Sequence, residues 1–177
     1  MAEHRFTLTI GGALTDERLD ALYEAGCDDA TFSTKGALTF GDFDREAPHL
    51  IDAVLSAVAA VESVDGLEVL HVDPDELVYA AEIAERASRT RGSIGHLISG
   101  VRGPGDFPPP AHHATRNPLW RWSEVEAWLA RYEGREADTE RSVALGAING
   151  ALQARHAFRS SSEEEALKRA VHQLIAS

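Results

Sequence analysis

Apolar residues in the first 72 positions recur with two periods, one typical of strands and the other typical of helices. Four strands are predicted, over residues 5–10, 29–34, 37–43 and 67–72. Two helices are predicted between them, one after Thr15 and one over residues 47–63. The order βαββαβ is that of a ferredoxin-like sandwich, a fold that serves many functions and so predicts no activity by itself.

Each of these elements has an expected buried face and expected ends. The apolar residues assigned to the buried faces are Phe6, Leu8, Ile10, Leu19, Leu22, Tyr23, Leu50, Val54, Val58, Val61, Leu67 and Val69. Thr15 is expected to cap the first helix, and Gly26 to end it in the left-handed conformation. Lys35 and Gly36 form a plausible hairpin turn, and Pro48 suits the first turn of the second helix.

Residues 73–132 have the pattern of a helix-turn-helix. A short helix begins near Ala80 and buries Ile83 and Ala87, and residues 88–90 interrupt it. Thr90 is a good N-cap for a second helix over residues 91–99. This helix would bury Ile94, Leu97 and Ile98, and its other side would carry Arg91, Gly92, Ser93, Gly95 and His96.

A wing is expected after the second helix. Residues 100–105 break the helix, residues 107–110 (FPPP) impose an extended path, and residues 112–117 would form the tip of a hairpin that closes at 119–122. Ser123 and Glu126 match a capping box for a helix over residues 124–132. This helix would bury Val125, Trp128 and Leu129, with Trp120 and Trp122 holding the wing against it.

The last 45 residues predict a polar linker and a helical hairpin. Ala144, Ile148 and Leu152 share one face of the first helix, and Ser162 with Glu165 matches a capping box for the second. The expected apolar face of the second helix is Leu167, Val171, Leu174 and Ile175. Such faces can fold back on the chain or associate between chains, and we expect a homodimer. The expected fold class is therefore α+β, with domains over residues 1–72, 73–132 and 133–177.

The predicted domains differ in net charge. The formal net charge is −12, and residues 1–72 hold 14 acidic against 4 basic residues, a net charge of −10. Between residues 86 and 121 only Asp106 is acidic, whereas six residues are arginines: Arg86, Arg89, Arg91, Arg102, Arg116 and Arg121. A basic stretch on an acidic chain favours contact with phosphate.

Residues 76–131 resemble the winged helix-turn-helix of MerR-type regulators, especially the small excisionase and AlpA-like form. The resemblance rests on AAEIAER at 80–86, RTR at 89–91, the F-P-x-P step at 107–110 and W-R-x-S-x-V-E-A-W at 120–128. It implies a bacterial protein that binds duplex DNA, with Arg89, Thr90, Arg91 and Ser93 at the turn and helix start. It implies DNA contacts for His112, Arg116 and Arg121 on the wing.

Together, these patterns predict a transcriptional regulator that binds double-stranded DNA. The expected DNA-binding residues are Arg89, Thr90, Arg91, Ser93, His96, Arg102, His112, Arg116 and Arg121. Gly92 and Gly95 stand where related helices carry longer side chains, which favours phosphate contacts over base readout. The alternative is a protein-interaction module, antitoxin-like or phage-related, that binds a protein partner through the winged fold or the acidic segment.

Other functions have little support in the sequence. Neither a nucleophile elbow nor a phosphate-binding glycine loop is present, so we expect no enzymatic activity and no cofactor. The single cysteine, Cys27, excludes an intramolecular disulfide, and His112 with His113 lacks further ligands for a metal. The chain has no signal-peptide pattern and no apolar run that could span a bilayer, so we expect a cytoplasmic, nucleoid-associated protein without membrane contact.

Overall fold

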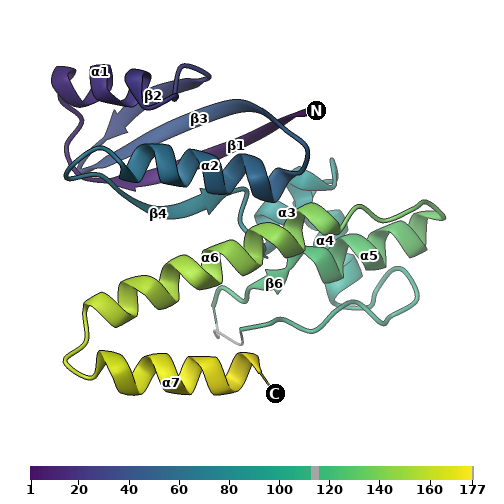
Figure 1. Cartoon of the computed structure of the whole chain (residues 1–177). Coiled ribbons are helices and arrows are strands. Elements are labelled where there is room, and N and C mark those ends of the chain that lie inside the picture. The colour runs from purple at the N-terminus through teal and green to yellow at the C-terminus, as the bar shows by residue number, and fades with distance from the viewer. Residues whose placement is uncertain (113–115, 177) are drawn as a thin grey trace. The chain divides into compact units, whose positions relative to one another are not determined.

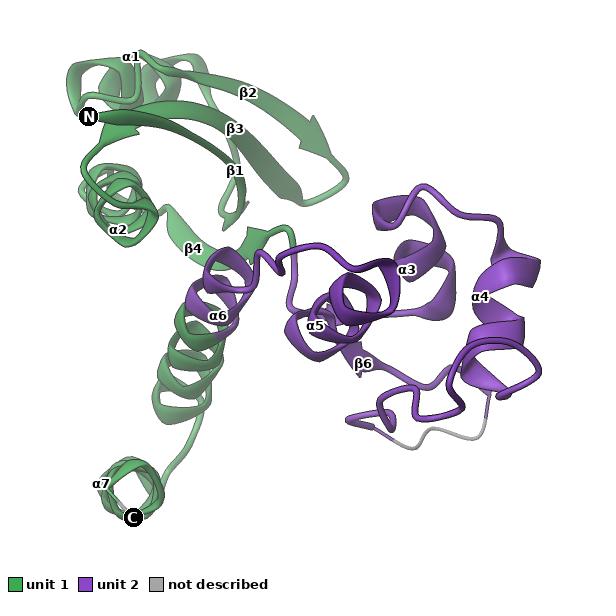
Figure 2. Cartoon of the chain, turned by 90° about the vertical axis from the view of Figure 1, so that its right-hand side faces the viewer, with its two compact units in different colours: residues 1–74, 147–177 green, residues 75–146 purple. Residues whose placement is uncertain are grey.

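The structure is a computed structural model that describes residues 1–112 and 116–176. It has α+β architecture, and the described residues form seven helices, a four-stranded antiparallel sheet and a two-stranded sheet. The chain divides into two compact units, which Figure 2 colours separately. Unit 1 contains residues 1–74 and 147–177, and unit 2 contains residues 75–146. Figure 1 labels the elements that are described unit by unit below.

The strands and helices of unit 1 follow the βαββαβ order expected from the sequence. They are β1 (Ala2–Gly11), α1 (Asp16–Glu24), β2 (Ala30–Lys35), β3 (Leu38–Ala47), α2 (Leu50–Glu62) and β4 (Glu68–Asp73). The order across the sheet is β2-β3-β1-β4, with every neighbouring pair antiparallel. Strands β2 and β4 are therefore the two edges of this sheet, and the β2–β3 hairpin turns at Gly36.

The alternation of apolar residues in β1 produces the core of unit 1. Phe6, Leu8 and Ile10 are buried, as predicted, and Phe6 stacks on Phe43 of β3 with ring centroids 5.4 Å apart. Helix α2 adds Val54 and other buried residues of the same face. Because strand side chains alternate between two faces, the intervening residues of β1 and β3 lie on the opposite, polar face.

Helix α1 begins and ends as predicted, but only one of its three expected core residues is buried. Thr15 Oγ1 accepts a hydrogen bond from Arg18 N at 3.3 Å, and Gly26 has a φ of +87°. Leu22 is buried, whereas Leu19 is 42% and Tyr23 69% exposed, so the prediction was wrong for these two residues. They line a surface pocket instead of facing the sheet core.

Helix α2 begins later than predicted because β3 is longer than predicted. Strand β3 continues to Ala47, which pairs with Ala2 of β1. Pro48 therefore follows the end of a strand, and the helix begins at Leu50. The ladder to β1 favours the extended conformation over residues that hydrophobic spacing alone assigned to the helix.

The outer edge of β4 is closed by side chains from two helices. Asn149, in α6 (Glu140–Arg159), donates to Val72 O and accepts from Val72 N, both at 2.9 Å. Arg155 donates to Val69 O at 2.9 Å, and Glu62 of α2 accepts from Val69 N at 3.0 Å. Arg155 also pairs with Glu62 at 2.6 Å. The backbone groups on the outer edge of β4 thus find partners without another strand.

These contacts change the predicted buried face of α6. Of the expected residues Leu152 is buried, but Leu145 and Asn149 are buried in place of Ala144 and Ile148. The predicted face was wrong by one position because the Asn149 side chain hydrogen-bonds the backbone of Val72, which places this polar residue in the interior. Hydrophobic periodicity assigns only apolar residues to the buried face, so it did not predict the burial of Asn149.

Helix α7 (Glu164–Ile175) follows α6 and buries none of its residues within the described chain. Leu174 and Ile175, on its predicted apolar face, are 76% and 80% exposed. The predicted capping box of Ser162 and Glu165 is not formed. Glu163 is the N-cap, and Ser161 Oγ accepts from Glu163 N at 3.0 Å.

Unit 2 has the helix–break–helix order that the sequence predicted. Its elements are β5 (Leu77–Val78), α3 (Ala80–Arg86), α4 (Arg91–Ile98), β6 (Trp120–Arg121) and α5 (Trp122–Glu133). The core residues are Val78, Ile83, Ala84, Ile94, Leu97, Trp120, Val125, Trp128 and Leu129. The predicted buried residues of all three helices are therefore confirmed, apart from Ala87 and Ile98, which are partly buried.

The small sheet of unit 2 differs from the predicted hairpin. Strand β6 pairs with β5, a strand that the sequence did not predict, through Val78 opposite Trp120. The two arms of the expected wing meet in the described residues only at the bridge between His112 and Leu119. Residues 113–115 of the expected tip lie outside the described residues.

Glu76 replaces the predicted capping box at the start of α5. Its carbonyl accepts from Trp122 N at 2.7 Å, and its carboxylate accepts from Ser123 N at 3.2 Å and from the Ser123 hydroxyl. Glu126, the predicted partner of Ser123, instead pairs with Arg135 at 2.9 Å. Gly146 covers Glu76, and a Cβ at Gly146 would lie 2.9 Å from the Glu76 Cβ.

Because the Asn149 amide closes the edge of β4, its removal should destabilise the fold. We expect Asn149→Ala to lower the free energy of unfolding by about 1–3 kcal/mol, because both backbone groups of Val72 would be buried without partners. Urea unfolding followed by far-UV circular dichroism measures the change. Gln153→Ala, an exposed substitution one turn away on the same helix, is the control. Equal stability of the two variants would contradict the assigned role.

A second prediction concerns Glu76. We expect Glu76→Ala to lower the free energy of unfolding of unit 2 by about 1–3 kcal/mol, because α5 loses its N-terminal acceptor. All three tryptophans lie in unit 2, so tryptophan fluorescence during urea unfolding reports on this unit. Glu85→Ala, which removes an exposed acid of α3, should leave the transition unchanged.

Candidate nucleic-acid interface

Helix α4 is held by its cap and by two core residues. Thr90 Oγ1 accepts from Ser93 N at 3.1 Å, as predicted, and Ile94 and Leu97 are buried. The helix therefore turns its remaining surface to solvent. Arg91 and His96 are exposed on this surface, and Ser93 is half-buried at its edge.

Two glycines lie on the exposed surface of α4 without a packing reason. A Cβ built at Gly92 or at Gly95 would meet no heavy atom within 4 Å. Neither residue has a positive φ, so neither backbone conformation requires glycine. Each glycine costs helical stability relative to alanine, by about 0.5–1 kcal/mol. The structure of the chain alone gives no benefit that offsets this cost.

Arg86 and Arg89 are held by contacts within unit 2. Arg86 donates to Asp75 O at 2.8 Å, and its guanidinium lies 5.4 Å from the centre of the Trp122 ring. Arg89 pairs with Glu133 at 2.6 Å and lies over the Tyr132 ring. Hydrogen bonds from Arg135 and Arg89 lower the pKa of Glu133, which keeps this carboxylate ionised. Glu133, distant in sequence, thus neutralises one arginine of the basic stretch.

Arg91 and Arg102 differ from these two. Both are exposed, and neither side chain makes a hydrogen bond or an ion pair with any residue in the described part of the chain. The backbone N of Arg102 donates to His96 O at 3.1 Å, which places the loop after α4 beside the end of that helix. Arg91, His96 and Arg102 therefore lie on α4 or directly beside it.

Asp106, the one acid within the basic stretch, does not neutralise these arginines. It accepts from Trp128 Nε1 at 2.7 Å and pairs with Arg131 at 3.0 Å. Its contacts hold the loop against α5. The charge of Arg91 and Arg102 remains directed to solvent.

The segment after this loop is anchored by aromatic contacts. Trp120 Nε1 donates to Pro108 O at 3.1 Å, and Phe107 lies edge-on to Trp120 and to Trp128, with centroids 6.5 and 5.0 Å apart. Trp120 thus contacts the start of this segment, whereas the contact given for Trp122 is with Arg86. The arrangement fixes the path of residues 107–112 and 117–121.

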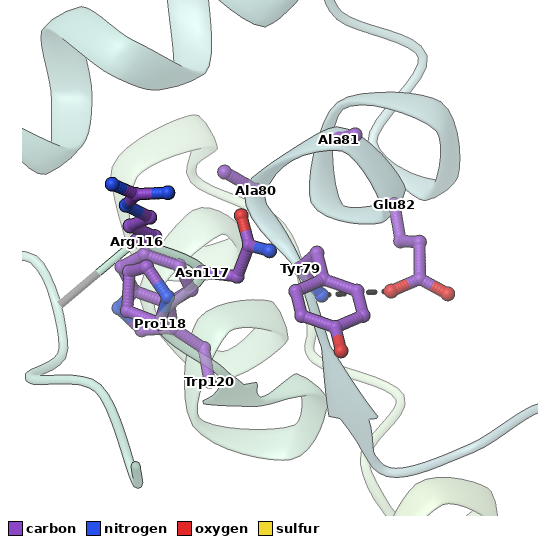
Figure 3. A pocket seen from close by; sticks show the side chains of 8 residues that line it. All are labelled: Tyr79, Ala80, Ala81, Glu82, Arg116, Asn117, Pro118 and Trp120. Atoms are coloured by element: carbon purple, nitrogen blue, oxygen red, sulfur yellow. Dashed lines mark hydrogen bonds between the residues drawn. The ribbon is translucent and has the colours of Figure 1, made fainter. Parts of the chain in front are cut away.

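The three remaining predicted residues lie on this segment. His112, Arg116 and Arg121 are exposed, and Arg121 Nε lies 4.0 Å from Glu124. Arg116 borders a pocket of about 400 Å³ between this segment and the start of α3 (Figure 3). The pocket is lined by Tyr79, Ala80, Ala81, Glu82, Arg116, Asn117, Pro118 and Trp120. Sequence reasoning missed Tyr79 and Asn117, because no pattern distinguishes a lone residue at a helix start or in a loop.

The described residues contain no group of three or more His, Cys, Asp or Glu side chains that could hold a metal ion. His113, which the sequence placed beside His112, lies outside them. No helix of the described chain is long and apolar enough to cross a membrane.

Comparison with known proteins gives no further assignment: no protein-family model, curated protein or solved structure matches the chain.

The open surface of α4 predicts a gain in stability on substitution of its glycines. We expect Gly92→Ala and Gly95→Ala each to raise the free energy of unfolding by about 0.5–1 kcal/mol, since alanine favours the helix and meets no obstacle. Gly103→Ala is the contrasting control. It has a φ of +80°, and its Cβ would lie 3.2 Å from Leu97 and 3.3 Å from Trp128, so it should destabilise unit 2. Urea unfolding followed by tryptophan fluorescence measures all three variants.

Proposed function

We propose that residues 73–132 form a winged helix-turn-helix that binds duplex DNA, and that the protein is a bacterial transcriptional regulator. The observation that carries this proposal is the pair of exposed arginines, Arg91 and Arg102, which have no partner among the described side chains and lie at α4 and beside it. An exposed helix with cationic side chains and no neutralising acid is suited to a polyanion.

Helix α4 is the recognition helix in this proposal. The N-terminal residues of such a helix contact the major groove, and Arg91 and Ser93 occupy these positions. At Gly92 and Gly95 the surface consists of backbone only, so the DNA can approach closely. Phosphate and shape contacts would then contribute more than readout of base edges.

The other predicted residues have supporting positions. His112, Arg116 and Arg121 are exposed on the wing segment, where they can contact the DNA backbone. Thr90 caps α4 and thereby fixes its start. Arg89 is paired with Glu133, which offsets its charge, so we expect it mainly to position the turn before α4.

The architecture supports a role for the remaining chain in association. The βαββαβ order and the sheet order β2-β3-β1-β4 favour a ferredoxin-like arrangement of residues 1–72. Helix α7 has exposed apolar residues, among them Leu167 and Ile175, that a homodimer could bury. A dimer would present two recognition helices to one duplex, and DNA binding would place the protein at the nucleoid.

A second candidate function, a protein-interaction module, is favoured by the acidic first segment. Residues 1–72 hold 14 acidic against 4 basic residues, a charge that repels DNA and attracts basic protein surfaces. The two functions are compatible, because the charges of opposite sign lie in different units.

The DNA-binding proposal predicts a salt-dependent affinity that responds to the two arginines. Fluorescence anisotropy with fragments of bacterial genomic DNA should show affinity that falls steeply between 50 mM and 200 mM salt, by about tenfold or more. Arg91→Ala and Arg102→Ala should each weaken binding and reduce the slope of log affinity against log salt by about 1. Gly92→Ala should also weaken binding, although it stabilises the helix.

The matched control is Arg169→Ala, which removes one exposed positive charge from α7. It should leave the salt slope unchanged. Absent binding, or equal effects of all three arginine variants, would overturn the proposal.

A further inference from the structure

The two edges of the sheet in unit 1 are treated differently. The edge of β4 is closed by Asn149, Arg155 and Glu62, as described above. In the part of the chain that the structure describes, no strand pairs with the outer edge of β2. Strand β2 also contains no proline, and its register with β3 has no irregularity. It thus lacks most of the features that usually prevent pairing at an edge.

The register identifies the backbone groups that β2 offers. Asp44 N donates to Asp29 O at 3.0 Å, so the odd-numbered residues of this strand exchange hydrogen bonds with β3. Phe32 and Thr34 alternate with them and direct N–H and C=O outward, and Ala30 directs its C=O outward. An extended peptide added to β2 would satisfy these groups.

A pocket of about 210 Å³ lies beside this edge, between α1 and β2. It is lined by Leu19, Asp20, Tyr23, Cys27, Asp28, Ala30 and Phe32. Cys27 is buried, and desolvation raises the pKa of its thiol, so the thiol is neutral near pH 7 and leaves the carboxylates as the charges of the pocket. Figure 1 shows α1 beside β2.

The chemistry of the pocket selects a basic side chain. Leu19 and Tyr23 give an exposed apolar wall, on which the methylene stem of lysine or arginine can lie. Asp20 and Asp28 supply two carboxylates, and neither makes an ion pair or hydrogen bond with another described residue. Tyr23 adds an aromatic ring suited to a cation.

From these observations we propose that β2 and the adjoining pocket bind an extended segment of another protein, which adds a strand to the sheet and places a lysine or arginine in the pocket. The backbone groups of β2 supply affinity, and Asp20 with Asp28 supplies selectivity. The net charge of −10 over residues 1–72 attracts such a segment.

A second copy of the chain fits this site less well. In an antiparallel pairing of two β2 strands, the side chains on the pocket side would be Ala30, Phe32 and Thr34, and none of them is basic. The two acidic segments would also repel each other.

The test uses the full chain and defined peptides. The probes are nine-residue peptides of alternating threonine and valine in which one position at a time is lysine, with a matched set that carries glutamate. Binding is followed by NMR through the backbone amide signals of the isotope-labelled protein. The best lysine peptide should bind about tenfold or more tightly than any glutamate peptide, and the signals that shift should be those of residues 19–23 and 28–35.

Two variants separate the pocket from the strand edge. Asp20→Asn should weaken binding of the lysine peptide about fivefold, whereas Glu17→Gln, which removes one charge from the same helix outside the pocket, should not. Thr34→Pro removes one outward N–H and should abolish binding with circular dichroism unchanged, because proline is tolerated on edge strands.

Four results would overturn the proposal: no binding by any lysine peptide, equal binding of both peptide sets, equal effects of Asp20→Asn and Glu17→Gln, or shifts confined to residues 75–146. A dimer in light scattering that Thr34→Pro converts to a monomer would assign the edge to a second copy instead. None of these measurements involves DNA, so failure here leaves the DNA-binding proposal to its own test.

Discussion

Backbone groups left over at sheet edges and helix ends must find partners, and in this protein side chains distant in sequence supply them. Asn149 and Arg155 hold the edge of β4, and Glu76 holds the start of α5. A buried backbone group without a hydrogen-bond partner costs about as much free energy of folding as the loss of a hydrogen bond. These few polar side chains therefore decide which segments belong together: residues 147–159 join unit 1, and the strand before α3 joins α5.

The same requirement explains where charge remains available at the surface. In unit 2, Arg86, Arg89, Arg131 and Arg135 are occupied by carbonyls or carboxylates, which leaves Arg91 and Arg102 exposed near α4. In unit 1, the closed edge of β4 contrasts with the open edge of β2. The exposed arginines near α4 lie in unit 2, and the excess of acidic residues lies in unit 1. Each unit therefore suits a different kind of partner.

Local patterns predicted the starts of α1, α3 and α4 and most core residues, and they failed where contacts with distant residues override them. Thr15 and Thr90 cap their helices as predicted, because an N-cap contact involves residues only three positions apart. Ser123 and Ser162 match the same signature, yet neither forms a capping box. At Ser123, the distant carboxylate of Glu76 accepts the hydrogen bonds that the capping box would have made. At Ser162, the helix begins one residue later than predicted, with Glu163 as its N-cap. For the candidate site, spacing identified which residues of α4 are exposed, but it counted six arginines as equivalent.

The sequence by itself determined the βαββαβ order of residues 1–73, the alternation that buries Phe6, Leu8 and Ile10, and the exposed face of α4, because these depend on periods of two and 3.6 residues along the chain. The tertiary structure decided that Asn149 is buried, that Leu19 and Tyr23 are exposed, and that β6 pairs with β5. It also decided which arginines are neutralised. These outcomes depend on pairings between residues tens of positions apart, and chain order alone does not specify which distant partner a polar group meets.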